Sequence, residues 1–381
     1  MRIAVNLLPF REKLAGAGNY TQNILRELVA LDAVNEYVFF VTLRAAAQFT
    51  FDAPNVKQLE LKLPAMLAAR IAYEQFILPF QKQFDLLFTP SVAIPIVWGT
   101  PLTRRVKKAT VIYDMMAEQR ALKKYPPLRN AYVRWMSRYA ARHSDTIITI
   151  SENSRRDIAH YARVPRENIL LAPPATNLER VTDAAILERV RDAYRLPERF
   201  ILYLGTLEPG KNLPFLVRAY ARLKNAHPEL DQHLVLAGAS GWGVREIENE
   251  ISKSDATGFH LIGFVEPDDL AALYSLADVF VYPSLYEGFG IPPLEAMACG
   301  TPVIVSNVSA LPEVLGELWT GKVAGLMASP RDERAWADAM ARVLTDKVLC
   351  EKLRVVGLER AQEFSWRASA QVVLEALNVS G

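Results

Sequence analysis

The 381-residue sequence has few residues of the kinds that build disulfide frameworks or metal centres. It contains two cysteines, Cys299 and Cys350, without metal-type spacing. This usage suits a reducing compartment, and we expect a cytoplasmic protein. No Asp-x-Asp pair occurs, and no His/Asp cluster has the spacing of metal ligands. We therefore predict that the protein binds neither a metal ion nor another cofactor.

Long apolar runs are also missing. The longest uncharged stretch, residues 86–103, includes three prolines, which argue against a continuous membrane-spanning helix. The first ten residues lack the long apolar core of a signal peptide and read better as a buried strand. We expect a chain that does not cross a membrane.

Length and charge both indicate two domains. One hydrophobic core rarely supports this many residues. Residues 1–180 contain 25 Lys and Arg against 15 Asp and Glu, whereas the remaining residues contain 19 against 27. The basic first half should attract an anionic partner.

Both halves alternate short apolar runs with segments of helical periodicity, which predicts doubly wound α/β domains. We expect strands at Arg2–Leu7, Tyr37–Val41, Leu86–Thr89, Lys108–Tyr113, Thr146–Ile150, Phe200–Leu204, His233–Ala237, His260–Phe264, Val279–Tyr282 and Pro302–Val305. We expect helices at Tyr20–Ala30, Leu128–His143, Leu213–Lys224, Asp268–Ser275 and Pro293–Cys299, and from about Arg331 to the end.

The domain junction is predicted at Ala172–Asn177, where Pro173 and Pro174 stiffen the chain. We expect domains at residues 1–174 and 175–365, with a last helix at 366–381 that packs back on the first domain.

The segment Tyr282–Ile304 combines several features of a binding loop. A strand ends near Pro283, a glycine-containing loop follows, and a helix begins at Pro292–Pro293. Amides at a helix start favour anions, and the carboxylates of Glu287 and Glu295 can accept hydrogen bonds from sugar hydroxyls. Spacing alone, however, favours the plainer interpretation of a helical glutamate as an exposed dipole partner.

The E-x7-E pair within EGFGIPPLEAMACGTPVI resembles the signature of glycosyltransferase family 4. Further resemblances cover nearly the whole chain: GAGNY at 16–20, SENSRRDI at 151–158, YLGTLEPGKN at 203–212, HLIGFVE at 260–266 and YSLADVFVYPS at 274–284. The resemblance implies an α/β GT-B fold, in which two Rossmann-like domains face a central cleft, and a reaction that retains anomeric configuration.

The resemblance also implies roles for individual residues. Lys211 would pair with the donor diphosphate, Glu295 would hold the ribose, and Glu287 would contact the transferred sugar. Asp114 would contact the donor sugar or the acceptor hydroxyl, which makes it the third catalytic candidate. The other candidate donor-binding residues are Thr206, Phe289, Gly290, Ile291, Val265, Gly16, Gly18 and Tyr113.

Two positions depart from the family pattern. Relatives usually carry His-Asp where this chain has Tyr113–Asp114, and tyrosine cannot act as a base near neutral pH. Many relatives also carry an arginine beside the phosphate-loop lysine, whereas this loop has Thr206 and Gly210. Lys211 would then bind the diphosphate with backbone amides alone.

Residues 104–142 contain eleven basic and two acidic side chains. One helical stripe carries Leu128, Tyr132, Trp135, Met136 and Tyr139, and Arg134, Arg138 and Arg142 follow another face. The stripe can lie on an anionic membrane, although docking on its own domain is the favoured interpretation. The remaining basic patch consists of Arg104, Arg105, Lys107, Lys108, Lys123 and Lys124. It suits lipid-linked or lipopolysaccharide acceptors at the inner membrane face, and no motif indicates nucleic acid.

We therefore predict a metal-independent hexosyltransferase. It would move a hexose or deoxyhexose, of mannose or rhamnose type and with GDP-mannose favoured as donor, to a hydroxyl of a lipid-linked or polysaccharide acceptor in bacterial surface glycan synthesis. A sugar-nucleotide epimerase and a non-catalytic sugar-nucleotide-binding protein remain alternatives. A nicotinamide-dependent dehydrogenase is disfavoured because its G-x-G-x-x-G motif is missing after the first strand.

Overall fold

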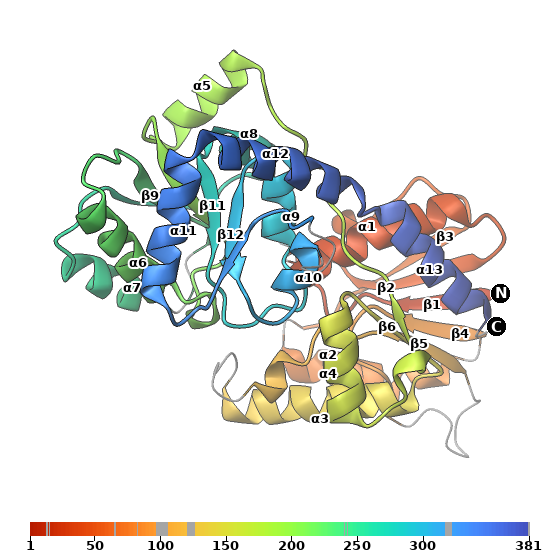
Figure 1. The fold of residues 1–381 in the computed structure, drawn as a ribbon. Coiled ribbons are helices and arrows are strands. Elements are labelled where there is room, and N and C mark those ends of the chain that lie inside the picture. The colour runs from red at the N-terminus through yellow and green to blue at the C-terminus, as the bar shows by residue number, and fades with distance from the viewer. Residues whose placement is uncertain are drawn as a thin grey trace. The chain divides into compact units, whose positions relative to one another are not determined.

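The computed structural model describes residues 1–12, 14, 16–64, 66–81, 83–96, 106–119, 126–239, 241, 243–316 and 322–379. The chain forms two compact units, Met1–Pro174 with Ser365–Gly381, and Ala175–Phe364 (Figure 1). Among the described residues, no helix is both long and apolar enough to cross a bilayer.

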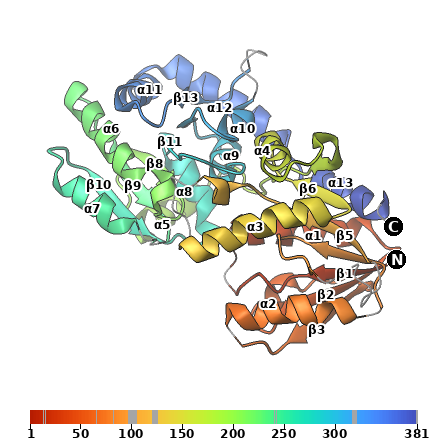
Figure 2. The same cartoon turned by 90° about the horizontal axis from the view of Figure 1, so that it is seen from below.

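The first unit is built on a seven-stranded parallel sheet in the order β3-β2-β1-β4-β5-β6-β7. Its strands are β1 (Arg2–Asn6), β2 (Glu36–Thr42), β3 (Val56–Leu61), β4 (Leu86–Thr89), β5 (Lys107–Val111), β6 (Thr146–Thr149) and β7 (Ile169–Leu171). Its helices are α1 (Gly16–Leu31), α2 (Leu67–Phe76), α3 (Pro127–His143), α4 (Glu152–Ala162) and α13 (Trp366–Val379). Figure 2 shows the same elements from below.

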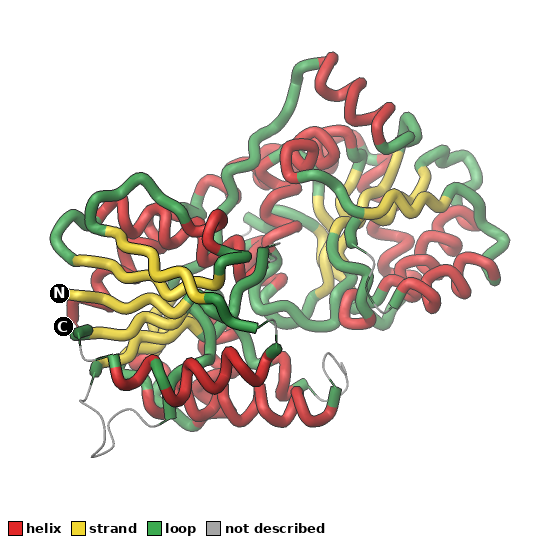
Figure 3. The backbone as a smooth tube through the Cα atoms, turned by 180° about the vertical axis from the view of Figure 1, so that it is seen from behind, coloured by secondary structure: helices red, strands yellow, loops and turns green. Residues whose placement is uncertain are grey.

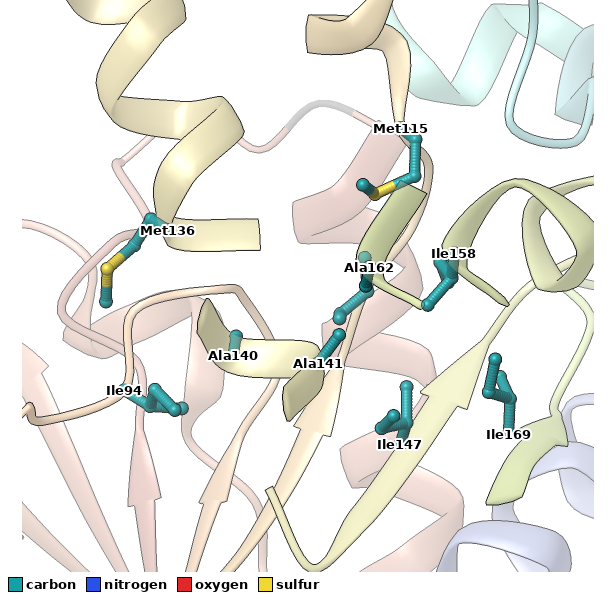
Figure 4. Packing of buried hydrophobic residues seen from close by; sticks show 10 residues of the cluster. Ile94, Met115, Met136, Ala140, Ala141, Ile147, Ile158, Ala162 and Ile169 are labelled. Atoms are coloured by element: carbon teal, nitrogen blue, oxygen red, sulfur yellow. The ribbon is translucent and has the colours of Figure 1, made fainter. Parts of the chain in front are cut away.

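The core of the first unit lies between this sheet and its helices. One cluster joins Met136 and Ala140 of α3 to Ile147 of β6 and Ile158 of α4 (Figure 4). Helix α13 packs on α1, where the rings of Trp366 and Tyr20 lie 5.7 Å apart. The last helix therefore belongs to the first unit, although the whole second unit separates the two in sequence.

The second unit repeats this plan with a six-stranded parallel sheet in the order β10-β9-β8-β11-β12-β13. Its strands are β8 (Phe200–Leu204), β9 (His233–Ala237), β10 (Phe259–Gly263), β11 (Val279–Tyr282), β12 (Val303–Ser306) and β13 (Leu326–Ala328). Its helices are α5 (Ala184–Ala193), α6 (Leu213–Ala226), α7 (Val244–Ser252), α8 (Leu270–Leu276), α9 (Ile291–Ala298), α10 (Leu311–Leu315), α11 (Glu333–Thr345) and α12 (Lys347–Gln362). The strands of both units appear in yellow in Figure 3. The predicted α/β class is confirmed.

The first unit buries one carboxyl group that should make its stability depend on pH. Glu74 of α2 is 1% exposed. The side-chain Nδ2 of Asn6 donates a hydrogen bond to Oε1 of Glu74 at 3.2 Å. Burial raises the pKa of Glu74 to about 7, against the opposing effects of Arg70 and Asn6. The unfolded chain therefore loses this proton at a lower pH than the folded protein does.

We expect this proton to stabilise the fold in acid. The contribution is complete below the ordinary glutamate pKa and is lost as pH rises to 7, a change of about 3 kcal/mol. Glu74→Gln should remove it. Urea unfolding of both proteins at pH 5 and pH 8 tests this, because the gap between wild type and variant should change with pH. A constant gap would contradict the prediction.

Candidate functional site

The candidate site lies where two neighbouring strands of the second unit end. Strands β8 and β11 pair in parallel, so the loops that follow them meet at the carboxyl edge of the sheet. Within these loops the amide of Leu285 donates to the carbonyl of Gly210 at 3.0 Å. The side chain of Asn212 donates to the carbonyl of Pro283 at 3.3 Å. The two loops are thereby held together.

Lys211 and Glu287 form an ion pair across these loops. The Nζ of Lys211 lies 2.6 Å from Oε1 of Glu287 and donates to the hydroxyl of Tyr282 at 3.0 Å. Burial opposes the charged lysine, but the Glu287 carboxylate outweighs it and holds the pKa of Lys211 well above its ordinary value. The site therefore contains a fixed positive charge at neutral pH.

Tyr282 is a site residue that the sequence analysis missed. Its ring lies under Lys211, with Nζ 5.2 Å from the ring centre. Its ring centre lies 5.9 Å from that of Tyr203 and also 5.9 Å from that of Phe280, and both ring pairs are nearly parallel. Its position could have indicated this role, because Tyr282 is the last residue of a buried strand. The hydroxyl of a buried tyrosine usually has a hydrogen-bond partner, which here lies where the strand ends.

The backbone around Glu287 is also fixed. Its amide donates to Oγ of Ser309 at 2.9 Å. Gly290 follows with φ +122, and a Cβ there would lie 2.8 Å from Leu311. Only glycine fits this turn without strain. Helix α9 begins directly after this glycine, at Ile291, which is one residue before the predicted start at Pro292–Pro293. The two prolines lie in the first turn of the helix, where a missing N–H costs nothing.

Glu295 lies further along α9 and has a different partner from Glu287. Its Oε2 accepts a hydrogen bond from the hydroxyl of Tyr274 at 2.8 Å. Burial raises the pKa of Glu295 above its ordinary value, although this hydrogen bond acts in the opposite direction. The plainer interpretation of Glu295 as an exposed dipole partner is therefore wrong.

The other predicted donor-binding residues of this unit differ in exposure. Thr206 is exposed and Ile291 is half-buried. Val265 and Phe289 are buried, and the ring of Phe289 packs edge-on against Phe364 at 5.4 Å. Val265 and Phe289 can therefore offer a ligand little more than their backbone groups.

The placement of the first unit's predicted glycines needs correction. The segment GAGNY resembles the family's Gly-rich loop after the first strand, but Gly16 and Gly18 instead open helix α1. A Cβ on Gly18 would lie 2.8 Å from the Leu14 side chain, whereas Gly16 has nothing within 4 Å. Close packing against Leu14 therefore accounts for one glycine, and nothing in the structure explains the other.

Tyr113 and Asp114 are engaged within the first unit. The hydroxyl of Tyr113 lies 2.7 Å from that of Thr21 and donates to the carbonyl of Pro90 at 3.0 Å. Oδ1 of Asp114 accepts from the amide of Met116 at 2.8 Å.

The arginines of α3 are partly neutralised by the protein itself. Arg138 donates two hydrogen bonds to Glu118, at 2.7 and 2.8 Å, and Arg134 lies 3.7 Å from the same carboxylate. On the stripe, Met136 is 1% exposed, whereas Leu128 is 89% exposed. Tyr132 and Tyr139 pack against the same core as Met136, so three of the five stripe residues dock on their own unit, as favoured. Arg104, Arg105, Lys123 and Lys124 of the basic patch lie outside the described residues.

No group of three or more His, Cys, Asp or Glu side chains comes together as metal ligands in the part of the chain that the structure describes. At the carboxyl edge of the second sheet, the Lys211 ammonium lies beside the Glu287 carboxylate. A fixed ammonium can take up anionic charge, and the carboxylate beside it can accept hydroxyl hydrogen bonds.

Two family models match this chain. The model described as Glycosyltransferase Family 4 matches residues 14–180. The model described as Glycosyl transferases group 1 matches residues 188–360. The two matched ranges together take in most of the chain, one model on each half.

Two similar proteins come from Escherichia coli. Serotype-specific mannosyltransferase WbdA is 33% identical over 258 residues, which are 66% of this chain and 30% of WbdA. This chain thus spans less than a third of that relative's length. O-antigen chain mannosyltransferase B is 28% identical over 378 residues, which are 96% of each chain.

Solved structures share the fold over the full chain. HepE from Anabaena, in complex with UDP-glucose, superposes with a TM-score of 0.77 at 17% identity and covers 100% of both chains. Sucrose-phosphate synthase from Thermosynechococcus elongatus gives 0.76 at 21% identity, covering 99% of this chain and 98% of that one. At identities this low, the superpositions show a shared fold and nothing about function.

Proposed function

We propose that this chain, a glycosyltransferase that belongs to family 4 and has the GT-B fold, transfers mannose or a related hexose or deoxyhexose from a nucleoside-diphosphate sugar. The acceptor would be a hydroxyl of a lipid-linked or polysaccharide chain in bacterial surface glycan synthesis. The names of the two E. coli mannosyltransferases support the sugar and the setting. UDP-glucose in the HepE complex supports a nucleotide-sugar donor.

The observation that carries this proposal is the Lys211–Glu287 ion pair at the carboxyl edge of the second sheet. The donor diphosphate would displace the Glu287 carboxylate from the Lys211 ammonium and pair with that ammonium itself. The Glu287 carboxylate would then be free to accept hydrogen bonds from the sugar. Glu295, half-buried beside Tyr274, would bind the ribose hydroxyls. The second unit would thus bind the donor and the first unit the acceptor.

In the proposed reaction the bond between the anomeric carbon and the diphosphate oxygen breaks, and the diphosphate leaves with the electron pair. The acceptor oxygen forms the new bond on the same face, which retains configuration. Its proton moves to the departing phosphate. Lys211 would stabilise the charge on the leaving group, and Glu287 the positive charge that grows at the sugar.

A sugar-nucleotide epimerase is the rival function, since it would use the same donor site without an acceptor. Incubation with a panel of GDP-, UDP- and dTDP-sugars separates the two. A glycosyltransferase slowly releases the nucleoside diphosphate from its own donor, with GDP-mannose expected to react fastest. Conversion of one nucleotide sugar into another, without release, would overturn the proposal.

The proposed reaction should not need a metal ion. Lys211 supplies the charge that Mg²⁺ or Mn²⁺ would otherwise bring to the leaving diphosphate. We expect donor turnover in 10 mM EDTA to stay within about twofold of the untreated rate. Loss of turnover that added Mg²⁺ or Mn²⁺ restores would contradict this prediction.

We place the protein in the cytoplasm, with peripheral contact to the inner face of the membrane through the first unit. The exposed side chains of Leu128 and Trp135 on α3, at 89% and 49%, support such contact. Apolar side chains beside arginines are typical of surfaces that rest on anionic lipid.

A further inference from the structure

The first unit contains a cavity of about 1030 Å³ that none of the roles above uses. It lies where β1, β2 and β3 end, since Leu8, Thr42 and Leu61 are among its lining residues. Ligands of parallel α/β sheets bind beyond the carboxyl ends of the strands. The size also suits a small-molecule site.

Positive charge dominates this cavity. Arg11, Arg44, Lys62 and Arg70 line it, against a single carboxylate, that of Glu12. Arg11, Arg44 and Lys62 form no ion pair with another described residue. Within the described part of the chain, these three charges are therefore not compensated by an ion pair. Such a site favours an anion.

Arg70 is the one cation of the cavity that the fold holds in place. Its Nε lies 3.5 Å from Oε2 of Glu74, and 24% of its side chain is exposed. Glu74 is itself fixed through Asn6 at the end of β1. Arg70 is thus anchored on its inner side while it lines the cavity.

Apart from Thr42, the remaining residues that line the cavity are apolar. Leu43 is 47% exposed and Met66 is 68% exposed, and both line the cavity together with Phe10 and Leu63. A site built for a neutral sugar would need several side-chain acceptors for hydroxyl groups, and this lining has only one carboxylate. Cations beside exposed apolar surface fit a ligand that joins a phosphate to a hydrocarbon chain.

We propose that this cavity binds the phosphorylated, hydrocarbon-linked end of the acceptor. Arg44, Lys62 and Arg70 contact the phosphate, and Leu43 and Met66 cover the adjoining hydrocarbon. That the ligand is the acceptor rests on the glycosyltransferase function proposed above. That the cavity binds a phosphate joined to a hydrocarbon does not depend on that function. The cavity thereby selects acceptors by their lipid phosphate and leaves the glycan free for transfer.

Calorimetric titration with decyl phosphate, below the concentration at which it forms micelles, tests the site directly. We expect it to bind at least about tenfold more tightly than decyl glucoside or inorganic phosphate, because only decyl phosphate offers both features. Its affinity should fall as salt is raised. If decyl glucoside binds equally well, the cavity does not recognise the phosphate. If inorganic phosphate binds equally well, the cavity does not recognise the hydrocarbon. Either result would overturn the proposal.

Variants locate the binding in this cavity. Arg44→Ala/Lys62→Ala should weaken decyl phosphate at least about tenfold, and Met66→Ser should weaken decyl phosphate but not inorganic phosphate. Arg26→Ala, which removes an exposed arginine of α1 outside the cavity, is the matched control and should change nothing. Unchanged decyl phosphate binding in the double variant would overturn the proposal.

Donor turnover without acceptor separates this inference from the proposed function. It should be unchanged in Arg44→Ala/Lys62→Ala, because both residues belong to the first unit, whereas Lys211 and Glu287 belong to the second. Lost decyl phosphate binding with intact donor turnover supports the cavity. If no nucleotide sugar is turned over by the wild type but decyl phosphate still binds, the proposed function fails and the binding site stands.

Discussion

Replacement of Lys211 by methionine should lower the rate of donor turnover at least about a hundredfold. The Nζ of Lys211, in the loop after β8, is the cation paired with Glu287, and 13% of this side chain is exposed. In such a partly desolvated place a positive charge stabilises a leaving diphosphate more strongly than it would in water. Methionine keeps the length and apolar stem of the side chain and removes only the charge.

Release of nucleoside diphosphate from the preferred donor measures this effect. Lys347→Ala, which removes an exposed lysine of the same unit at the start of α12, should leave the rate unchanged. Lys211→Arg should recover part of the activity, because it restores the charge with a different head-group shape. A Lys211→Met protein that is folded and keeps more than about a tenth of the rate would remove Lys211 from the reaction.

Much of the architecture could be predicted because the strands are short, apolar and bounded by turns. The bounds of β4, β8, β9 and β11 agree with the predicted ranges at every residue. The missed strands carry weaker signals. β3 is an edge strand whose polar residues Lys57, Gln58 and Glu60 interrupt the apolar run, and β7 and β13 have three residues each.

The sequence indicated Lys211, Glu287 and Glu295 as candidate site residues, but it indicated neither Tyr282 nor the pairing of these side chains. Lys211 and Glu287 each follow a predicted strand, but nothing in one sequence says that β8 and β11 are neighbours in the sheet. The Glu295 pairing with Tyr274 joins α8 to α9 and depends on the same tertiary packing. Gly16 and Gly18 were misplaced because the resemblance of GAGNY to the family's Gly-rich loop implied a loop, whereas here α1 begins at Gly16.

Removal of one partner of the Lys211–Glu287 pair should also lower folding stability. Both side chains are largely buried, at 13% and 11% exposure, so each charge depends on the other for compensation. Loss of one partner of such a pair typically costs about 3 kcal/mol, because the remaining charge stays buried without a partner. We expect Lys211→Met to lower the free energy of unfolding by about that amount.

The double variant Lys211→Met/Glu287→Gln should recover most of this loss, because no unpaired charge remains in the site. Urea unfolding of the wild type, both single variants and the double variant closes the thermodynamic cycle. Donor turnover should stay low in the double variant although its stability returns, since the diphosphate still lacks its cation. A coupling energy below about 1 kcal/mol would mean that solvent screens the pair like a surface salt bridge. Glu287 would then be free to leave Lys211 at little cost, and the donor would not have to displace it.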